Sequence, residues 1–200
     1  MAWASIIAAV RISLRQVSAQ ARACRLCHRQ LDPRPVFRAG TGARLLIVGQ
    51  APGRRVHESG IPWNDPSGDV LREWLKMERD VFYDTSRVAI VPMGLCYPGT
   101  VAGADLPPPP RCAALWQPRF RAALPDIELT LLVGSYAQKF YLGETRVSET
   151  VRHWREYLPR YFPLPHPSWR NKAWIMRNPW FVKDVIPALR RRVNALLRSV

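Results

Sequence analysis

The sequence predicts an α/β fold, with three α/β/α layers around a mostly parallel central sheet of about four strands. Short, wholly apolar segments alternate along the chain with longer segments of helical periodicity. Unbroken apolar segments are typical of strands that are covered on both faces, as in a parallel sheet. The length of 200 residues and the apolar content of 48% fit one full-sized core. We therefore expect a single domain over residues 1–200.

The predicted strands are the short apolar segments at residues 44–48, 88–91, 129–133 and 161–164. The predicted helices cover residues 4–22, a segment from about 66, then 112–123, 136–142, 147–157 and about 180–197. The first of these, helix 4–22, carries apolar residues at near-helical spacing and leads straight into Cys24, although a transit peptide is an alternative. The four prolines at 107–110, which follow residues 99–105, predict a stiffened loop.

The chain has a net charge of +15, and the charge is unevenly distributed. Residues 1–57 carry +9, residues 58–156 carry −2 and residues 157–200 carry +8. If the fold brings the two basic segments together, they form the positive face that a phosphate backbone requires, and the alternative is a solvated basic surface. No apolar run is long enough to span a membrane, and we expect a cytoplasmic protein with no membrane contact and no obligate protein partner.

Four cysteines form a CxxC pair and a second pair with 15 residues between its members. They are Cys24, Cys27, Cys96 and Cys112. In a reducing cytosol such thiols rarely form disulfides and are good metal ligands. The alternative is that they are unrelated buried thiols. The spacing is compatible with a [4Fe–4S] cluster or with a structural Zn ion.

Two loops follow predicted strands and should meet at the carboxyl edge of the sheet, where ligands bind in such folds. The first is GQAPG, comprising Gly49, Gln50, Ala51, Pro52 and Gly53, and the second is HPS at residues 166–168. The first loop lacks the GK[ST] of a phosphate-binding loop and the spacing of a dinucleotide fingerprint. A plain strand–helix turn is its alternative interpretation.

Three side chains near these loops are candidates for chemistry. Asp65 could direct water to a glycosidic carbon, or it could simply cap the helix that begins at Pro66. Trp63 could stack on a base or belong to the core. His166 stands between two prolines that could hold its ring toward a ligand, where it would donate a hydrogen bond to a departing base.

A mixed polar, aromatic and basic segment follows His166, and this combination suits a wedge that enters a groove while phosphates are held nearby. The DNA-binding candidates are Ser168, Trp169, Arg170, Asn171 and Lys172.

Together, these motifs resemble those of the uracil-DNA glycosylase superfamily from about Cys24 to Asn171. GQAPG resembles its first motif and HPSWRN its second, and the cysteine spacing is similar to that of its iron–sulfur families 4 and 5. The resemblance implies a [4Fe–4S] cluster on the four cysteines. It also implies that Asp65 acts on water, that Trp63 stacks on the base and that His166 polarises the leaving base.

Three departures from the family patterns stand out. Family 4 has Glu at the position of Gln50, and since Gln cannot be a general base, Gln50 should only position water or base. The Asn with which family 4 reads uracil is absent, and residues 92–94 occupy that area. The basic loop with an embedded His, found in covalently DNA-trapping relatives, is replaced by GTVAGADLPPPP, so crosslinking to DNA is not expected.

The sequence thus predicts a monofunctional DNA glycosylase that removes uracil or another deaminated base from single- or double-stranded DNA and initiates base-excision repair. One alternative is a DNA-damage-binding iron–sulfur protein with little or no catalysis. Another is a Zn-stabilised hydrolase of small nucleotides.

Overall fold

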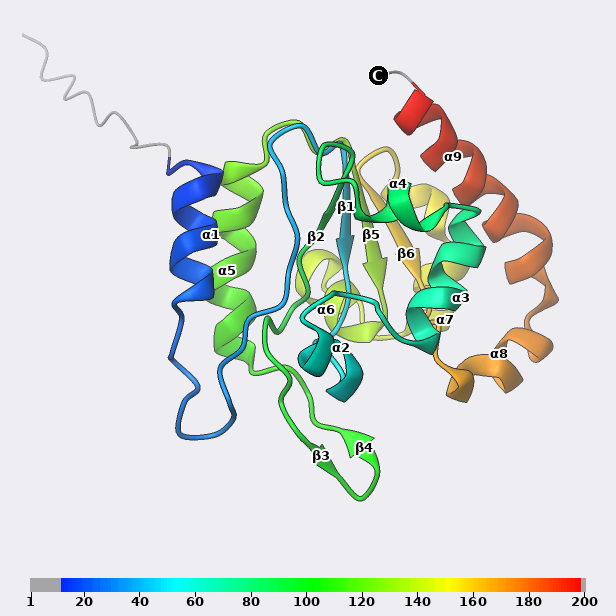
Figure 1. Ribbon diagram of the computed structural model, residues 1–200. Helices are drawn as coiled ribbons and strands as arrows, with labels where there is room; N and C mark the ends of the chain where they lie inside the picture. Colours follow the sequence, from blue (N-terminus) through cyan, green and yellow to red (C-terminus); the bar gives the residue numbers. More distant parts are fainter. Residues whose placement is uncertain (1–11, 199–200) are drawn as a thin grey trace, which may run out of the picture.

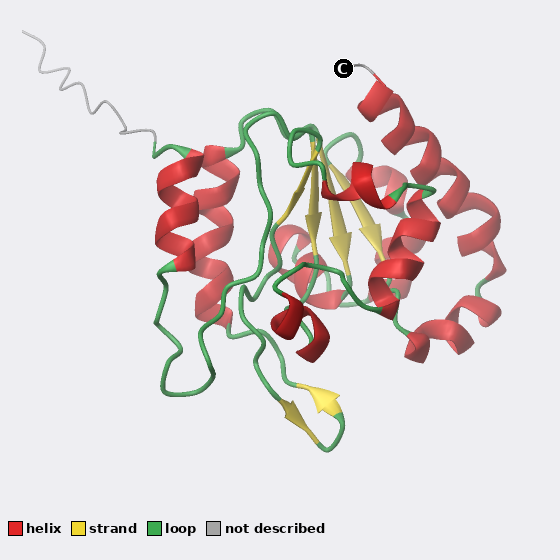
Figure 2. Cartoon of the chain, in the orientation of Figure 1, coloured by secondary structure: helices red, strands yellow, loops and turns green. Residues whose placement is uncertain are grey.

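The computed structural model describes residues 12–198 and has the predicted three-layer architecture (Figures 1 and 2). Its centre is a sheet of four strands, and helices cover both faces. The strands are β1 (Leu45–Val48), β2 (Val88–Ile90), β5 (Leu129–Val133) and β6 (Tyr161–Leu164). All four agree with the predicted segments to within one residue.

The strands lie in the order β2-β1-β5-β6, and every neighbouring pair is parallel. All four carboxyl ends therefore meet at one edge, which is the lower edge in Figure 1. The loops that follow β1 and β6 leave from that edge, as the sequence predicts.

Successive residues of β1 point to opposite faces of the sheet and divide the core in two. Leu45 and Ile47 pack with α3 (Pro66–Leu75) and α9 (Ile186–Arg198). Leu46 and Val48 pack with α1 (Leu14–Arg22) and α5 (Pro110–Ala123) on the other face. This alternation explains why an unbroken apolar strand is needed, because neither face is exposed to water.

The remaining helices complete the two outer layers. They are α1 (Leu14–Arg22), α2 (Arg54–Ser59), α4 (Arg79–Tyr83), α5 (Pro110–Ala123), α6 (Ser135–Leu142), α7 (Val147–Arg152) and α8 (Lys172–Arg177). Short 3-10 turns follow at Trp154–Tyr157 and Trp169–Asn171, and a π-helical segment at Phe181–Val185 precedes α9. No helix within residues 12–198 is long and apolar enough to cross a membrane.

Two predicted boundaries need correction. The first helix does not extend unbroken from residue 4, because Ser13 has an extended backbone and caps α1 by accepting a hydrogen bond from the Gln16 amide. Residues 4–11 of the predicted helix lie outside the described residues. The helix predicted over 147–157 is interrupted after Arg152, and its second half is a 3-10 turn.

The segment before the four prolines, the last of which, Pro110, begins α5, forms a small antiparallel ribbon, made of β3 (Thr100–Val101) and β4 (Ala104–Asp105). Its two turn residues, Ala102 and Gly103, both have positive φ angles, of 49° and 74°, as a tight primed hairpin turn requires. The hairpin projects from the carboxyl edge of the main sheet (Figure 1).

Candidate active site

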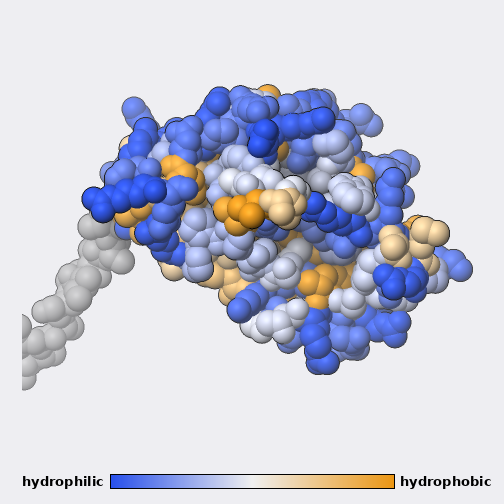
Figure 3. All heavy atoms as spheres, turned by 90° about the horizontal axis from the view of Figure 1, so that it is seen from below, coloured by the Kyte–Doolittle hydropathy of each residue, from blue (hydrophilic) through white to orange (hydrophobic). Residues whose placement is uncertain are grey.

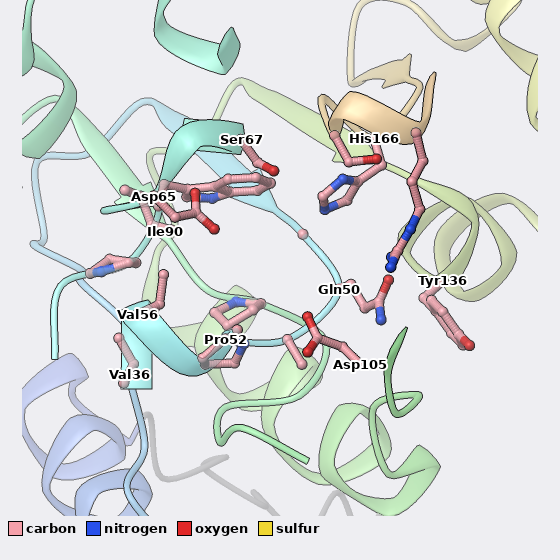
Figure 4. Close-up of a pocket in the computed structure, with 18 of the residues that line it drawn as sticks. Val36, Gln50, Pro52, Val56, Asp65, Ser67, Ile90, Asp105, Tyr136 and His166 are labelled. Atoms are coloured by element: carbon pink, nitrogen blue, oxygen red, sulfur yellow. The ribbon is translucent and has the colours of Figure 1, made fainter. Parts of the chain in front are cut away.

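The two predicted loops meet in one cavity of about 610 Å³ at the carboxyl edge of the sheet (Figure 4). All five residues of GQAPG line it, together with Trp63, Asp65 and His166. Segments more than 100 residues apart in the sequence therefore build a single site. The cavity is large enough for a nucleobase.

Backbone hydrogen bonds fix the GQAPG loop to the segment that follows β2. The Met93 amide donates to the Gly49 carbonyl at 3.0 Å, and the Gly94 amide donates to the Gln50 carbonyl at 2.8 Å. These bonds continue the parallel pairing of β1 and β2 beyond the sheet. They leave the Gln50 side chain directed into the cavity (Figure 4).

Two glutamines that are buried behind the site hold the strand ends. The Gln117 amide donates to the carbonyls of Val91 and Pro92, at 3.2 and 2.9 Å. The Gln138 amide donates to the carbonyl of Leu164, at 2.9 Å, two residues before His166. Backbone groups at strand ends would otherwise be unpaired in the interior, so these amides stabilise the walls of the cavity.

Trp63 is held in an unusual conformation, and two glycines make room for it. Its φ angle is +57°, a left-handed conformation that bulky residues rarely adopt. A Cβ on Gly49 would lie 2.6 Å from the Trp63 ring, and one on Gly68 would lie 1.7 Å from the Trp63 carbonyl oxygen. The Arg72 guanidinium donates to that same carbonyl at 3.1 Å. This support places the indole on the cavity wall, with its ring centroid 5.7 Å from that of His166.

Asp65 caps α3, as one of its two predicted roles requires, and it also lines the cavity. Its carboxylate accepts a hydrogen bond from the Gly68 amide at 2.8 Å. Burial raises the pKa of Asp65, while the Gly68 hydrogen bond and the charge of Arg72 oppose the rise. A buried carboxylate with a raised pKa is more basic than one in water.

His166 lies on the wall that faces Asp65 across the cavity (Figure 4). Burial lowers its pKa to about 4, and the negative charge of Asp105 acts in the opposite direction. The ring is therefore neutral at pH 7 and can donate one N–H. The Asn171 amide donates to the His166 carbonyl at 2.6 Å and fixes the backbone of this loop.

The segment after His166 borders the mouth of the cavity. Ser168, Trp169, Arg170 and Asn171 line it, whereas Lys172 is exposed at the start of α8 and does not. Trp169 has 74% of its surface exposed. Viewed from below, this face is mostly hydrophilic with small, separated apolar patches (Figure 3).

A comparison with protein families gives a match to the family model of the uracil DNA glycosylase superfamily over residues 37–190. That range is well over half of the chain. The chain belongs to the uracil DNA glycosylase superfamily. The matched range contains Gln50, Trp63, Asp65 and His166, but not Cys24 or Cys27.

The cavity contains two of the positions at which this chain departs from the family 4 pattern. Pro92, one of the residues standing where family 4 relatives carry an Asn, lines the cavity and offers no hydrogen-bonding side chain. Gln50 is also in the cavity, where an amide can donate and accept hydrogen bonds but cannot take up a proton at neutral pH. The cavity therefore lacks both the Asn and the Glu that family 4 relatives carry at these two positions.

The sequence interpretation missed three polar side chains of the cavity, Ser67, Asp105 and Tyr136. Tyr136 lies in the first turn of α6, directly after a predicted strand, so its place at the carboxyl edge could have been anticipated. Asp105 could have been found only by identifying Ala102–Gly103 as a hairpin turn. The hairpin carries Asp105 back over the cavity.

The four cysteines converge on a second, smaller cavity, which shares no lining residue with the first. All four line its wall, from the loop after α1, the segment after β2 and the start of α5. The Leu95 amide donates to the Cys112 sulfur at 3.3 Å. Within residues 12–198, however, no group of three or more Cys, His, Asp or Glu side chains is arranged to hold a metal ion.

The thiols of Cys96 and Cys112 are in an apolar environment. Burial raises the pKa of Cys96 to about 12 and that of Cys112 to about 11. Leu31, Leu95 and Trp116 also line this cavity. Thiols in such surroundings remain protonated unless a cation stabilises the thiolates.

Proposed function

We propose that this member of the uracil DNA glycosylase superfamily is a monofunctional enzyme that hydrolyses the N-glycosidic bond of uracil, or of a related deaminated base, in DNA, and so initiates base-excision repair. The observation that carries the proposal is the placement of Asp65 and His166 on facing walls of one base-sized cavity, with Trp63 beside them. An extruded nucleotide would occupy the space between them.

His166 would stabilise the departing base. When the glycosidic bond breaks heterolytically, the bond electrons remain on the base and negative charge accumulates on its oxygens. A neutral imidazole N–H, held by a fixed loop, donates a hydrogen bond to that developing charge. The lowered pKa, about 4, keeps the ring in this neutral form.

Asp65 would act on the sugar side of the bond. One carboxylate oxygen is held by the Gly68 amide, which fixes the side chain. The other can orient water toward the sugar carbon, accept its proton and stabilise the positive charge that develops on the sugar. Gln50 would assist by positioning water or base.

Trp63 would stack on the extruded base, and the exposed Trp169 would enter the duplex or stack on a neighbouring base. Arg170, together with Arg55, whose charge acts on Asp65, supplies positive charge near the site. The substrate is therefore DNA, single- or double-stranded, in which phosphates are held while one base is extruded.

The absence of a lysine in the lining supports a monofunctional reaction. Among the described residues 12–198, no lysine lines the cavity. A lyase step requires an amine to form a Schiff base with the sugar. Water is thus the nucleophile, and the products are a free base and an abasic site.

Cys24, Cys27, Cys96 and Cys112 would hold a [4Fe–4S] cluster. Their convergence from three chain segments on one apolar cavity, with a backbone amide donating to a sulfur, supports this assignment. A structural Zn ion on the same four thiolates is the alternative. When bound, the cluster would tie the loop after α1 to α5.

The test is base release from oligonucleotides that contain uracil, hypoxanthine or xanthine, in single- and double-stranded form, with anaerobically purified protein. We expect an alkali-labile abasic site from at least one base with the wild type and none from Asp65→Asn or His166→Ala. Asp126→Asn, a change of the same charge at the opposite end of β5, is the matched control and should remain active.

Iron and acid-labile sulfide should be found at about four atoms each per chain. Tight DNA binding without release of any of the three bases would refute the catalytic proposal and favour a damage-binding protein. Zinc in place of iron would refute the cluster without affecting the glycosylase proposal.

A further inference from the structure

Asp105 brings a second carboxylate into the cavity, from a segment that takes no part in the catalytic motifs. It is the last residue of the β3–β4 hairpin, which lies in sequence between Cys96 and Cys112. Asp105 and Gly103 both line the cavity beside GQAPG. Figure 4 shows the side chains of Asp105 and Gln50 directed into the same space.

The carboxylate is held in place by a short chain of hydrogen bonds. The Thr100 hydroxyl donates to one oxygen of Asp105 at 3.0 Å, and Tyr97 is hydrogen-bonded in turn to Thr100. At the hairpin turn, the Arg170 guanidinium donates to the Gly103 carbonyl at 3.1 Å. Asp105 is therefore positioned both from its own ribbon and from the loop that contains His166.

One oxygen of this carboxylate faces the base site without a protein partner. A Cβ placed on Gly53 would lie 3.5 Å from Oδ2 of Asp105, so this oxygen lies close to the GQAPG loop. Within residues 12–198 no protein group donates a hydrogen bond to it. Its negative charge also reaches His166, which locates it near the position of the departing base.

An ionised carboxylate can only accept hydrogen bonds, so its placement selects for a donor on the ligand. Phosphates have no donors and repel it, which makes it unsuitable for contacts with the DNA backbone. Uracil and hypoxanthine each present a ring N–H beside a carbonyl. Pro92, which lines the cavity, has no side-chain group that could accept a hydrogen bond from that N–H.

We propose that Asp105 accepts a hydrogen bond from the ring N–H of the extruded base, and is thereby a specificity-determining residue of this glycosylase. The proposal deepens the function proposed above and rests on it. The Gln50 amide, in the same cavity, would donate to the adjacent carbonyl. Thr100 is a positioning residue, which orients the carboxylate without touching the base.

The experiment compares a base with its N-methylated counterpart, because methylation removes only the donor that Asp105 would meet. Whichever of uracil and hypoxanthine the wild type releases faster is paired with N3-methyluracil or N1-methylhypoxanthine in the same oligonucleotide. Single-turnover rates and DNA affinities are measured for wild type, Asp105→Ala and Asp105→Asn. Asp126→Ala controls for the loss of one negative charge.

We expect Asp105→Ala to reduce the single-turnover rate on the unmethylated base by about 10-fold to 100-fold, the effect of losing one hydrogen bond to a charged group. Asp105→Asn keeps a neutral carbonyl acceptor and should lose less. Methylation should slow the wild type by at least about 10-fold, and this penalty should shrink to about 3-fold or less in Asp105→Ala. Affinity for undamaged DNA should stay the same or increase in both variants, because a charge that repels phosphate is removed.

Two results would overturn the proposal while leaving the glycosylase function intact. One is activity of Asp105→Ala on the unmethylated base within 3-fold of the Asp126→Ala control. The other is a methylation penalty of equal size in wild type and Asp105→Ala, or no release of the methylated base by either protein. Either outcome would mean that Asp105 has a structural role or acts through His166. Failure of the wild type to release any base would instead refute the proposed function, and this inference with it.

Discussion

Burial of His166 should make the stability of this protein fall as the pH is lowered through the weakly acidic range. The folded protein holds the pKa of His166 at about 4, whereas an unfolded chain exposes the ring to water with a pKa near its ordinary value of 6.5. Between these values the unfolded state binds a proton that the folded state does not. Acid therefore favours unfolding.

The magnitude follows from the two pKa values. At pH 7.5 the group is neutral in both states and makes almost no difference. At pH 5 the unfolded state is stabilised by about 2 kcal/mol through proton uptake, and the full effect, about 3 kcal/mol, is reached only below pH 4. His166→Gln, which has no titratable ring, removes this contribution at every pH.

The measurement is urea unfolding of wild type and His166→Gln at pH 7.5, 6 and 5. The quantity of interest is the change with pH of the difference in unfolding free energy between the two proteins, because contributions from other groups then cancel. His153→Gln, at an exposed position, is the matched control. If the difference between wild type and His166→Gln is constant from pH 7.5 to 5, the ring is not buried as described and its neutrality at pH 7 has no support.

Three further predictions concern the walls and mouth of the cavity. Asp65→Asn should reduce base release by at least about 100-fold, the contribution of a general base, yet change the unfolding free energy by only a few tenths of a kcal/mol, because Asn caps a helix as well as Asp does. Gly49→Ala should lower the unfolding free energy by about 1–3 kcal/mol and alter tryptophan fluorescence, because its Cβ would lie 2.6 Å from the Trp63 ring. Trp169→Ala should leave stability within about 0.5 kcal/mol, since its side chain is 74% exposed, but weaken binding to damaged DNA by about 1–3 kcal/mol, as measured by fluorescence anisotropy.

Each of these has a distinct contrary outcome. Full activity in Asp65→Asn would transfer the water-directing role to another group. A Gly49→Ala protein with unchanged fluorescence and stability would show that the Trp63 ring does not pack closely against Gly49. Unchanged DNA binding in Trp169→Ala would leave that exposed ring without a role in DNA recognition.

The strands and the meeting of the two loops could be predicted from the sequence because both depend on local patterns and one general rule. Unbroken apolar segments such as 129–133 identify strands that are buried on both faces, and parallel strands present their carboxyl ends at one edge. His166 and the GQAPG loop follow such strands directly. Their convergence in one cavity therefore required no knowledge of the tertiary packing.

The details that depend on individual contacts could not be predicted in this way. The left-handed conformation of Trp63 is accommodated by Gly49 in the GQAPG loop and by Gly68 and Arg72 in α3, two separate places in the sequence. The position of Asp105 depends on a two-residue turn whose strands are each only two residues long. Strands this short leave almost no periodicity to detect.

The β3–β4 hairpin also bears on how enzymes of this architecture can diversify. It is an exposed ribbon whose two strands pair only with each other, and it joins the segment that contains Cys96 to the one that contains Cys112. The ribbon can change in sequence or in length without disturbing the packing of the core. The walls of the cavity, in contrast, are held by the buried amides of Gln117 and Gln138. If Asp105 recognises the base as proposed, new lesion preferences can arise through changes in this ribbon, while the GQAPG and His166 loops stay unchanged.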